Sequence, residues 1–153
     1  GHHWPDTLIF NANHLQVFTA TTTSGLQKML SLKRIDYFPR SILEIWQEHA
    51  TSEYPELTIE PHIVMTYPAA IYFFVSKDNS VLQRLIKLGL ELAIADGSFD
   101  RLFQQNFAAV IQLANLQQRR RFNLTNSLIT DTEYLSRSEL WFSTPQDEPT
   151  SWD

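Results

Sequence analysis

The spacing of apolar residues changes repeatedly along this chain, and this change constrains the fold more than any other feature. Stretches with an apolar side chain every three to four residues, the helical period, alternate with short β-branched or aromatic runs typical of strands. A helical bundle or an all-β sandwich would keep a single period. The 153 residues, of which 43% are hydrophobic, supply enough apolar material for a folded core. The pattern therefore predicts an α/β fold.

Capping residues and apolar stripes predict five helices. The first begins near Pro5, because proline beside an acidic residue favours a first helical turn. Gly97 is expected to end the fourth, because glycine readily adopts the left-handed conformation. The predicted helices cover residues 5–13, 22–32, 41–49, 78–96 and 98–116, and a break in the last one near Asn106 is left open.

Five short segments have the composition of strands. The clearest are residues 63–65 and 70–75, which the Tyr67-Pro68 pair separates. The others are residues 15–19, 34–38 and 57–60. From Asn123 onward the periodicity fades, and residues 145–153 are expected to form a loose polar tail.

Charge and composition exclude several classes of protein. With 12 Lys and Arg against 17 Asp and Glu, the chain lacks the basic excess of a general nucleic-acid binder. The longest uncharged apolar run, residues 63–76, is broken by Pro68 and is shorter than the roughly 20 residues of a transmembrane helix. The absence of cysteine excludes disulfides, thiol nucleophiles and cysteine-ligated metals. Phosphate-binding and nucleophile motifs are also missing, which disfavours nucleotide hydrolysis and dehydrogenase chemistry. We predict no enzymatic activity and no cofactor.

Two groups of residues with reactive or charged side chains each have a functional and a structural interpretation. Glu44, Glu48 and His49 would suit a metal or acid/base site, but a solvated helix face is the far more common explanation of such a pattern. The basic run of residues 119–121 would contact phosphate or a partner, or complement the negative end of a helix dipole. His2 and His3 are either native residues or the remnant of a tag.

Two features point to ligand binding. Backbone amides at the helix start formed by Trp4, Asp6 and Thr7 can hold a carboxylate. Arg40 and Ser41 directly follow a predicted strand, the position at which α/β sheets bind ligands. The alternative for Arg40 is an ion pair with Glu44, four residues on. Tyr37 and Tyr72 are the expected stacking surfaces, so the candidate ligand contacts are Trp4, Asp6, Thr7, Tyr37, Arg40, Ser41 and Tyr72.

Several segments resemble one bacterial family. Residues 30–36 (LSLKRID) are similar to its L-x-x-G-R-x-D-A strand entry, and residues 72–77 (YFFVSK) to its return strand. Residues 82–92 and 95–103 (ADGSFDRLF) are similar to its closing helices, with their L-x-x-x-D-G-T-x-x-x-I pattern. On these motifs the chain resembles the extracellular solute-binding proteins of family 3, two-lobed periplasmic proteins of polar amino-acid uptake.

The resemblance implies a type II periplasmic-binding-protein fold with most of its first lobe missing. Residues 1–73 would form the second-lobe α/β segment, and residues 74–144 the return strand and C-terminal helices of the first lobe. It also implies non-catalytic binding of a small polar or anionic, amino-acid-like solute for an ABC-type permease. The sequence departs from the family at Lys33, where glycine is usual, and at Ser41, where an acid holds the ligand's ammonium group.

A partial first lobe has a physical consequence. The helices predicted over residues 81–94 and 98–116 would lose the sheet that normally covers them, which would expose large apolar faces. We therefore expect a homodimer or an exchange of helices between chains. Two alternatives use the same fold: a sensor or interaction domain, and one lobe of a cell-wall-degrading enzyme.

Overall fold

The computed structural model describes residues 4–130 and 133–143. The helices and strands in chain order are α1 (Pro5–Ala12), α2 (Thr23–Ser31), α3 (Ile45–Ala50), β1 (Ile63–Thr66), α4 (Ser80–Ala95), α5 (Ser98–Ala114) and β2 (Arg120–Asn123). Three single-turn 3-10 helices complete the list: η1 (Leu116–Gln118), η2 (Tyr134–Ser136) and η3 (Ser138–Leu140). The α/β class predicted from the sequence is confirmed by this mixture of helices and a parallel sheet.

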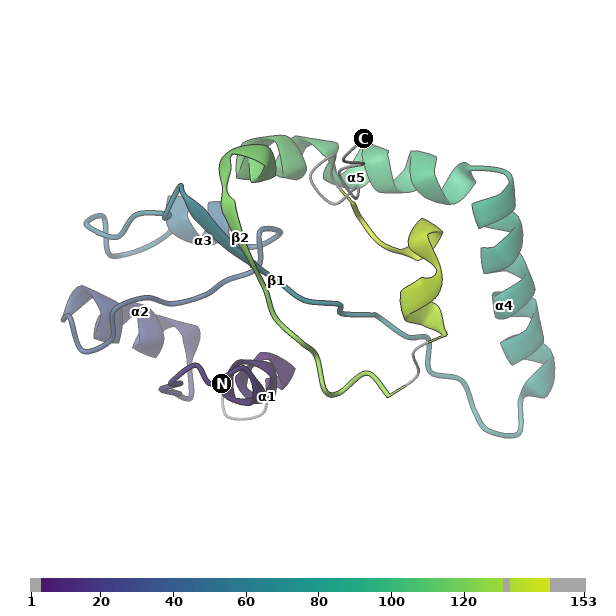
Figure 1. Ribbon diagram of the computed structural model, residues 1–153, viewed down its shortest axis with the longest axis horizontal. Helices are drawn as coiled ribbons and strands as arrows, with labels where there is room; N and C mark the ends of the chain where they lie inside the picture. The colour runs from purple at the N-terminus through teal and green to yellow at the C-terminus, as the bar shows by residue number, and fades with distance from the viewer. Residues whose placement is uncertain (1–3, 131–132, 144–153) are drawn as a thin grey trace, which may run out of the picture.

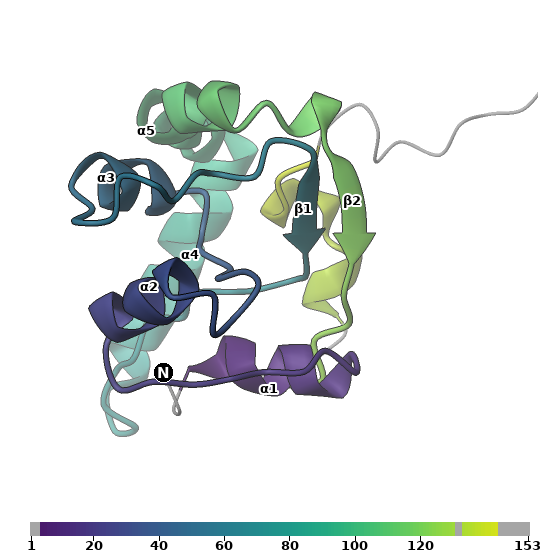
Figure 2. The same ribbon diagram turned by 90° about the vertical axis from the view of Figure 1, so that its left-hand side faces the viewer.

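The sheet consists of β1 and β2, which pair in parallel with Ile63 opposite Arg120 and Thr66 opposite Asn123. Parallel strands need a long crossover connection, and here it contains α4 and α5 (Figures 1 and 2). The sheet therefore joins the two stretches assigned to different lobes.

Just beyond the sheet, Asn13 at the end of α1 is hydrogen-bonded to Thr125, which follows β2. The Asn13 side-chain amide donates to the Thr125 carbonyl at 2.8 Å, and the Thr125 amide donates back to Asn13 Oδ1 at 3.0 Å. This reciprocal pair fixes the end of α1 against the chain that leaves β2.

Arg119 connects the end of α5 to the beginning of β1. Its Nε donates to the Ala114 carbonyl at 2.6 Å, and its Nη1 donates to the carbonyls of Ile63, at 3.1 Å, and Glu60. Cations at a helix C-terminus satisfy carbonyls that have no partner within the helix. The helix-dipole interpretation of the basic run is thus confirmed for Arg119, whereas Arg120 and Arg121 lie in β2.

Several predicted strands are absent from the sheet. Residues 63–65 are a strand, but 15–19, 34–38, 57–60 and 70–75 are not, and those predictions are wrong. A strand forms only where a neighbour accepts its backbone hydrogen bonds. The polar strand β2 was missed because its sequence, RRFN, has no apolar alternation.

The boundaries of two helices also differ from the predicted ones. The third helix starts at Ile45 rather than at residue 41, because the Ser41 hydroxyl accepts the Leu43 amide in a preceding turn. The break left open near Asn106 does not occur; α5 is continuous to Ala114, where Asn115 ends it with a left-handed φ of 46°. The tail at 145–153, His2 and His3 lie outside the described residues.

The buried apolar residues are few. Among the described residues they are Ile9, Leu26, Ala114 and Leu116. In contrast, no residue of α4 is buried. The prediction that the C-terminal helices expose apolar faces is therefore confirmed for α4. Within the described ranges, none of the helices is long and apolar enough to cross a bilayer.

Candidate functional site

The first part of the site is the N-terminus of α1. Trp4 is its N-cap and Pro5 its first residue, as the sequence predicted. The Asp6 carboxylate, in the first turn, accepts a hydrogen bond from the Tyr67 hydroxyl. The Tyr67 ring in turn meets Phe10 edge to face, with centroids 6.1 Å apart. This contact ties the start of α1 to the segment that follows β1.

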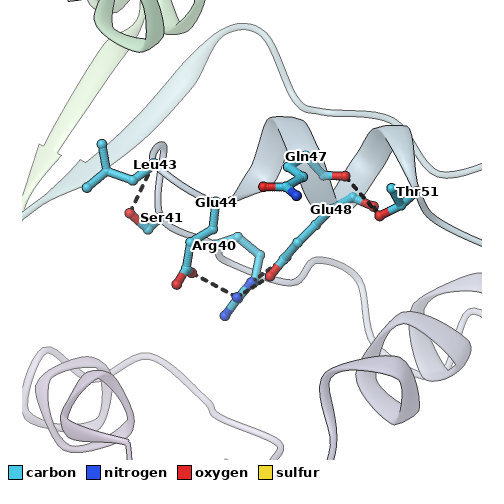
Figure 3. Close-up of polar contacts among 7 residues, drawn as sticks. All are labelled: Arg40, Ser41, Leu43, Glu44, Gln47, Glu48 and Thr51. Atoms are coloured by element: carbon cyan, nitrogen blue, oxygen red, sulfur yellow. Dashed lines mark hydrogen bonds and ion pairs between the residues drawn. The ribbon is translucent and has the colours of Figure 1, made fainter. Parts of the chain in front are cut away.

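The second part is Arg40, which lies just before the turn that leads into α3. Its Nε donates to Glu48 Oε2 at 2.7 Å, and its Nη2 contacts Glu48 Oε1 and Glu44 Oε2, the latter at 2.8 Å (Figure 3). A guanidinium bound by both oxygens of one carboxylate is held in a fixed orientation. The ion pair with Glu44 foreseen as the alternative role of Arg40 is confirmed.

Two aromatic rings flank the same guanidinium. Arg40 Cζ lies 5.0 Å from the centroid of the Trp4 ring and 5.5 Å from that of Phe38. Cations at this distance are attracted by the ring face. Trp4, Phe38, Arg40, Glu44 and Glu48 are together called the Arg40 cluster below.

The Arg40 cluster carries more negative than positive charge. One guanidinium faces two carboxylates, which leaves a net charge of −1, and Asp6 adds a nearby negative charge. The hydrogen bond with Glu48, together with the charges of Glu48, Glu44 and Asp6, raises the pKa of Arg40 against the opposing effect of burial. The Arg40 side chain is only 9% exposed, whereas the Glu44 side chain is 54% exposed. The charged group of this pair that is accessible to solvent is therefore the Glu44 carboxylate.

Two hollows border the Arg40 cluster. A cavity of about 60 Å³ beneath it is lined by Leu30, Phe38 and Ile45, among others. That volume is well below the roughly 300 Å³ of small ligand pockets. An open groove of about 380 Å³ lies between α2 and α3, lined by Ser24, Gln27, Glu48, Thr51, Ser52 and Glu53. The groove has the size for a small solute and shares Glu48 with the cluster.

Trp4, Asp6 and Arg40 are the predicted contacts that the structure brings together. Thr7 follows in the first turn of α1, with its amide donating to the Trp4 carbonyl. The hydroxyl of Ser41 is a turn acceptor for the Leu43 amide at 3.2 Å.

The two tyrosines take no part in these contacts. Tyr37 and Tyr72 are 57% and 60% exposed. Within residues 4–130 and 133–143, neither makes a polar or ring contact with the Arg40 cluster. Their role as stacking surfaces stays a prediction.

The alternative acid/base site does not assemble in this arrangement. Glu44 and Glu48 both face Arg40, whereas the His49 imidazole lies 3.0 Å from the Leu57 carbonyl. Within the described parts of the chain, no three His, Cys, Asp or Glu side chains are grouped as metal ligands.

Sequence reasoning missed Glu48 and Tyr67 as partners of the predicted site. A signal for Glu48 existed, because Glu44 and Glu48 are four residues apart and therefore share a helix face. No signal existed for Tyr67, which is 61 residues from its acceptor Asp6.

Comparisons with known proteins returned no match, whether against protein-family models, curated proteins or solved structures.

Proposed function

We propose that this chain is a non-catalytic solute-binding module, part of a two-lobed, type II periplasmic protein that delivers a small amino-acid-like solute to an ABC-type permease. The observation that carries the proposal is the Arg40 cluster, where an oriented guanidinium, a tryptophan face and two carboxylates converge, and where Glu48 also lines an open polar groove. Such convergent polar groups beside a hollow are typical of small-molecule sites.

The net negative charge of the Arg40 cluster indicates which of the expected solutes would bind best. An ammonium group is attracted to Glu44, Glu48 and the nearby Asp6, whereas a purely anionic solute meets a net negative charge. An ammonium group also fits the Trp4 face. Of the polar and anionic solutes expected from the sequence, those that carry an ammonium group therefore fit best.

One backbone feature supports the family resemblance independently of the site. Lys33 replaces the glycine of the strand-entry motif, and it adopts a φ of 54°. Glycine adopts this left-handed conformation most readily. The chain thus bends where the motif has its glycine, although the side chain differs.

Isothermal titration of the 153-residue chain tests the proposal, with lysine, glutamine, glutamate, succinate and small peptides as titrants. We expect binding of at least one amino acid and weaker or no binding of succinate. Absence of heat for every titrant, or preference for succinate, would contradict the proposal.

Two variants locate the binding site. Arg40→Ala is expected to weaken amino-acid binding at least about 10-fold, because it removes the side chain that holds Glu44 and Glu48 in position. Glu44→Gln should weaken it about 3- to 10-fold, since a charge-assisted hydrogen bond is worth about 1 to 3 kcal/mol. Arg34→Ala and Asp100→Asn are the matched controls at exposed positions outside the cluster. Circular dichroism checks that Arg40→Ala is folded, and full binding by both cluster variants would exclude this site.

A further inference from the structure

The outward face of α4 carries an apolar stripe that no described part of the chain covers. Val81, Leu85, Leu88 and Leu92 are between 57% and 60% exposed. Their spacing of four, three and four residues is that of the core positions of a coiled coil. Side chains at this spacing lie along one line of the helix. These four residues are called the α4 seam below.

The partly buried residues of α4 lie away from the seam. They include Ile86, Ala93 and Ile94, whereas Glu91, which lies beside the seam, receives two hydrogen bonds from Arg137, at 2.7 and 2.8 Å. Figure 1 shows the segment of η2 and η3 beside α4. At 100° per residue, Ile86 and Ala93 lie more than a quarter turn from the α4 seam, so the seam faces away from the rest of the chain.

Charged side chains beside the seam are complementary to those of a second copy. Arg84 and Glu91 are seven residues apart and flank the seam on the same side. If two α4 helices pair antiparallel with Val81 opposite Leu92, then Arg84 of each copy lies near Glu91 of the other. Glu91 and Glu139 share one guanidinium, that of Arg137, so this group keeps a net charge of −1. A parallel pair would instead place Arg84 near Gly89 of the other copy, where it would have no charged partner.

Gly89 provides space beside the seam near the middle of α4. A Cβ built on Gly89 would have no heavy atom within 4 Å. A missing side chain at mid-helix allows a neighbouring helix to approach closely. The closest approach of two copies is therefore expected near the centre of the helix.

We propose that α4 is a dimerisation helix, and that it packs antiparallel against α4 of a second copy through the α4 seam. A two-fold axis near the helix centre brings Val81 opposite Leu92 and Leu85 opposite Leu88, each contact occurring twice. This surface lies outside the Arg40 cluster, so an experiment can contradict the proposed dimer without contradicting the proposed ligand site, and the reverse.

Light scattering coupled to size-exclusion chromatography measures the mass over a concentration series from submicromolar to hundreds of micromolar. We expect a shift from 17.8 kDa to twice that mass as concentration rises. A monomer at every concentration overturns the proposal. A mass of three or more chains at the highest concentrations also overturns it.

Leu88→Glu tests the seam directly, because it places two carboxylates in the centre of the interface. The dimer dissociation constant is expected to increase at least about 100-fold. Leu102→Glu is the matched control, since Leu102 is 60% exposed but lies on α5. Equal weakening by both variants, or by neither, contradicts a specific role for the seam. Because both positions are exposed, both variants should keep their helical circular dichroism.

Single cysteines test the antiparallel direction, since the chain has none of its own. Under mild oxidation, Val81→Cys chains mixed with Leu92→Cys chains are expected to form the mixed disulfide. Neither variant alone should cross-link, because its two copies lie about 16 Å apart along the helix axis, at about 1.5 Å per residue. A dominant Val81→Cys homodimer would instead demonstrate a parallel pair and overturn the proposed arrangement.

Discussion

Two regions of this chain differ in how far their apolar side chains are covered, and the region richer in apolar residues is the less covered one. The first, called the junction, comprises α1, the β1–β2 sheet and residues 114–126. The second, called the arm, comprises residues 69–95. In the junction, Ile9 is 2% exposed and Ala114 is 1% exposed. In the arm, Ile71 and Phe74 are fully exposed.

This difference shows that contacts between residues distant in sequence, rather than apolar composition, determine which side chains are buried in this chain. The junction is closed by bonds between residues distant in sequence, namely Asp6 with Tyr67, Asn13 with Thr125 and Arg119 with Ile63. Residues 69–75 of the arm receive no backbone hydrogen bond within the described chain, although they are extended and strongly strand-like.

The largest expected effect separates the two regions by their contribution to stability. Ile9→Ala should lower the free energy of unfolding by about 2 to 5 kcal/mol, because it leaves a cavity in the junction. Leu88→Ala in the arm should change it by less than about 0.5 kcal/mol at a concentration where the chain is monomeric. Urea denaturation of both variants measures the difference. Comparable losses would show that the arm is as well packed as the junction.

A smaller effect is expected from the side chain that holds the junction together. Arg119→Ala removes hydrogen bonds to three carbonyls and should destabilise the chain by about 2 kcal/mol. Arg120→Ala removes a guanidinium that lies 5.2 Å from the Phe122 ring and should cost at most about 1 kcal/mol. Thermal unfolding of the pair provides the measurement, and a larger loss for Arg120→Ala would refute this account of the junction.

The smallest effect concerns Tyr67, at the boundary of the two regions. Burial and the hydrogen bond to Asp6 raise the pKa of Tyr67 above its ordinary value of 10.0. Because the folded-state pKa is the higher one, the stability from this contact is present below pH 10 and is lost as pH rises further. Tyr67→Phe should destabilise the chain by about 1 kcal/mol at neutral pH.

Ultraviolet titration of tyrosinate detects the shifted group directly. One of the five tyrosines should ionise later than the others, and Tyr67→Phe should remove this late phase. Tyr72→Phe, in the exposed part of the arm, is the matched control and should retain it. A late phase that persists in Tyr67→Phe would show that the contact with Asp6 does not govern the titration.

Local signals in the sequence predicted much of the helical structure. The N-terminal proline of α1, the threonine cap of α2 and the glycine before α5 each lie where the helix boundary was expected. These signals act within one turn of the backbone, so they need no knowledge of the rest of the fold. The ion pair between Arg40 and Glu44 was predictable for the same reason.

Strands and the composition of the site were predicted less well. Residues 34–38 and 70–75 have strand composition but no strand beside them, and β2 is a strand despite its polar sequence. The approach of Trp4 and Phe38 to Arg40 also depends on how α1 and the chain before α3 pack together.

The sequence by itself determined the α/β class, the positions of most helices and the apolar stripe of α4, because these follow from backbone propensity and side-chain period. Only the tertiary structure decided which strands pair and that Arg40 is held by Glu48 as well as Glu44. The physical reason is that hydrogen bonding between strands and burial depend on partners distant along the chain, which no local pattern specifies.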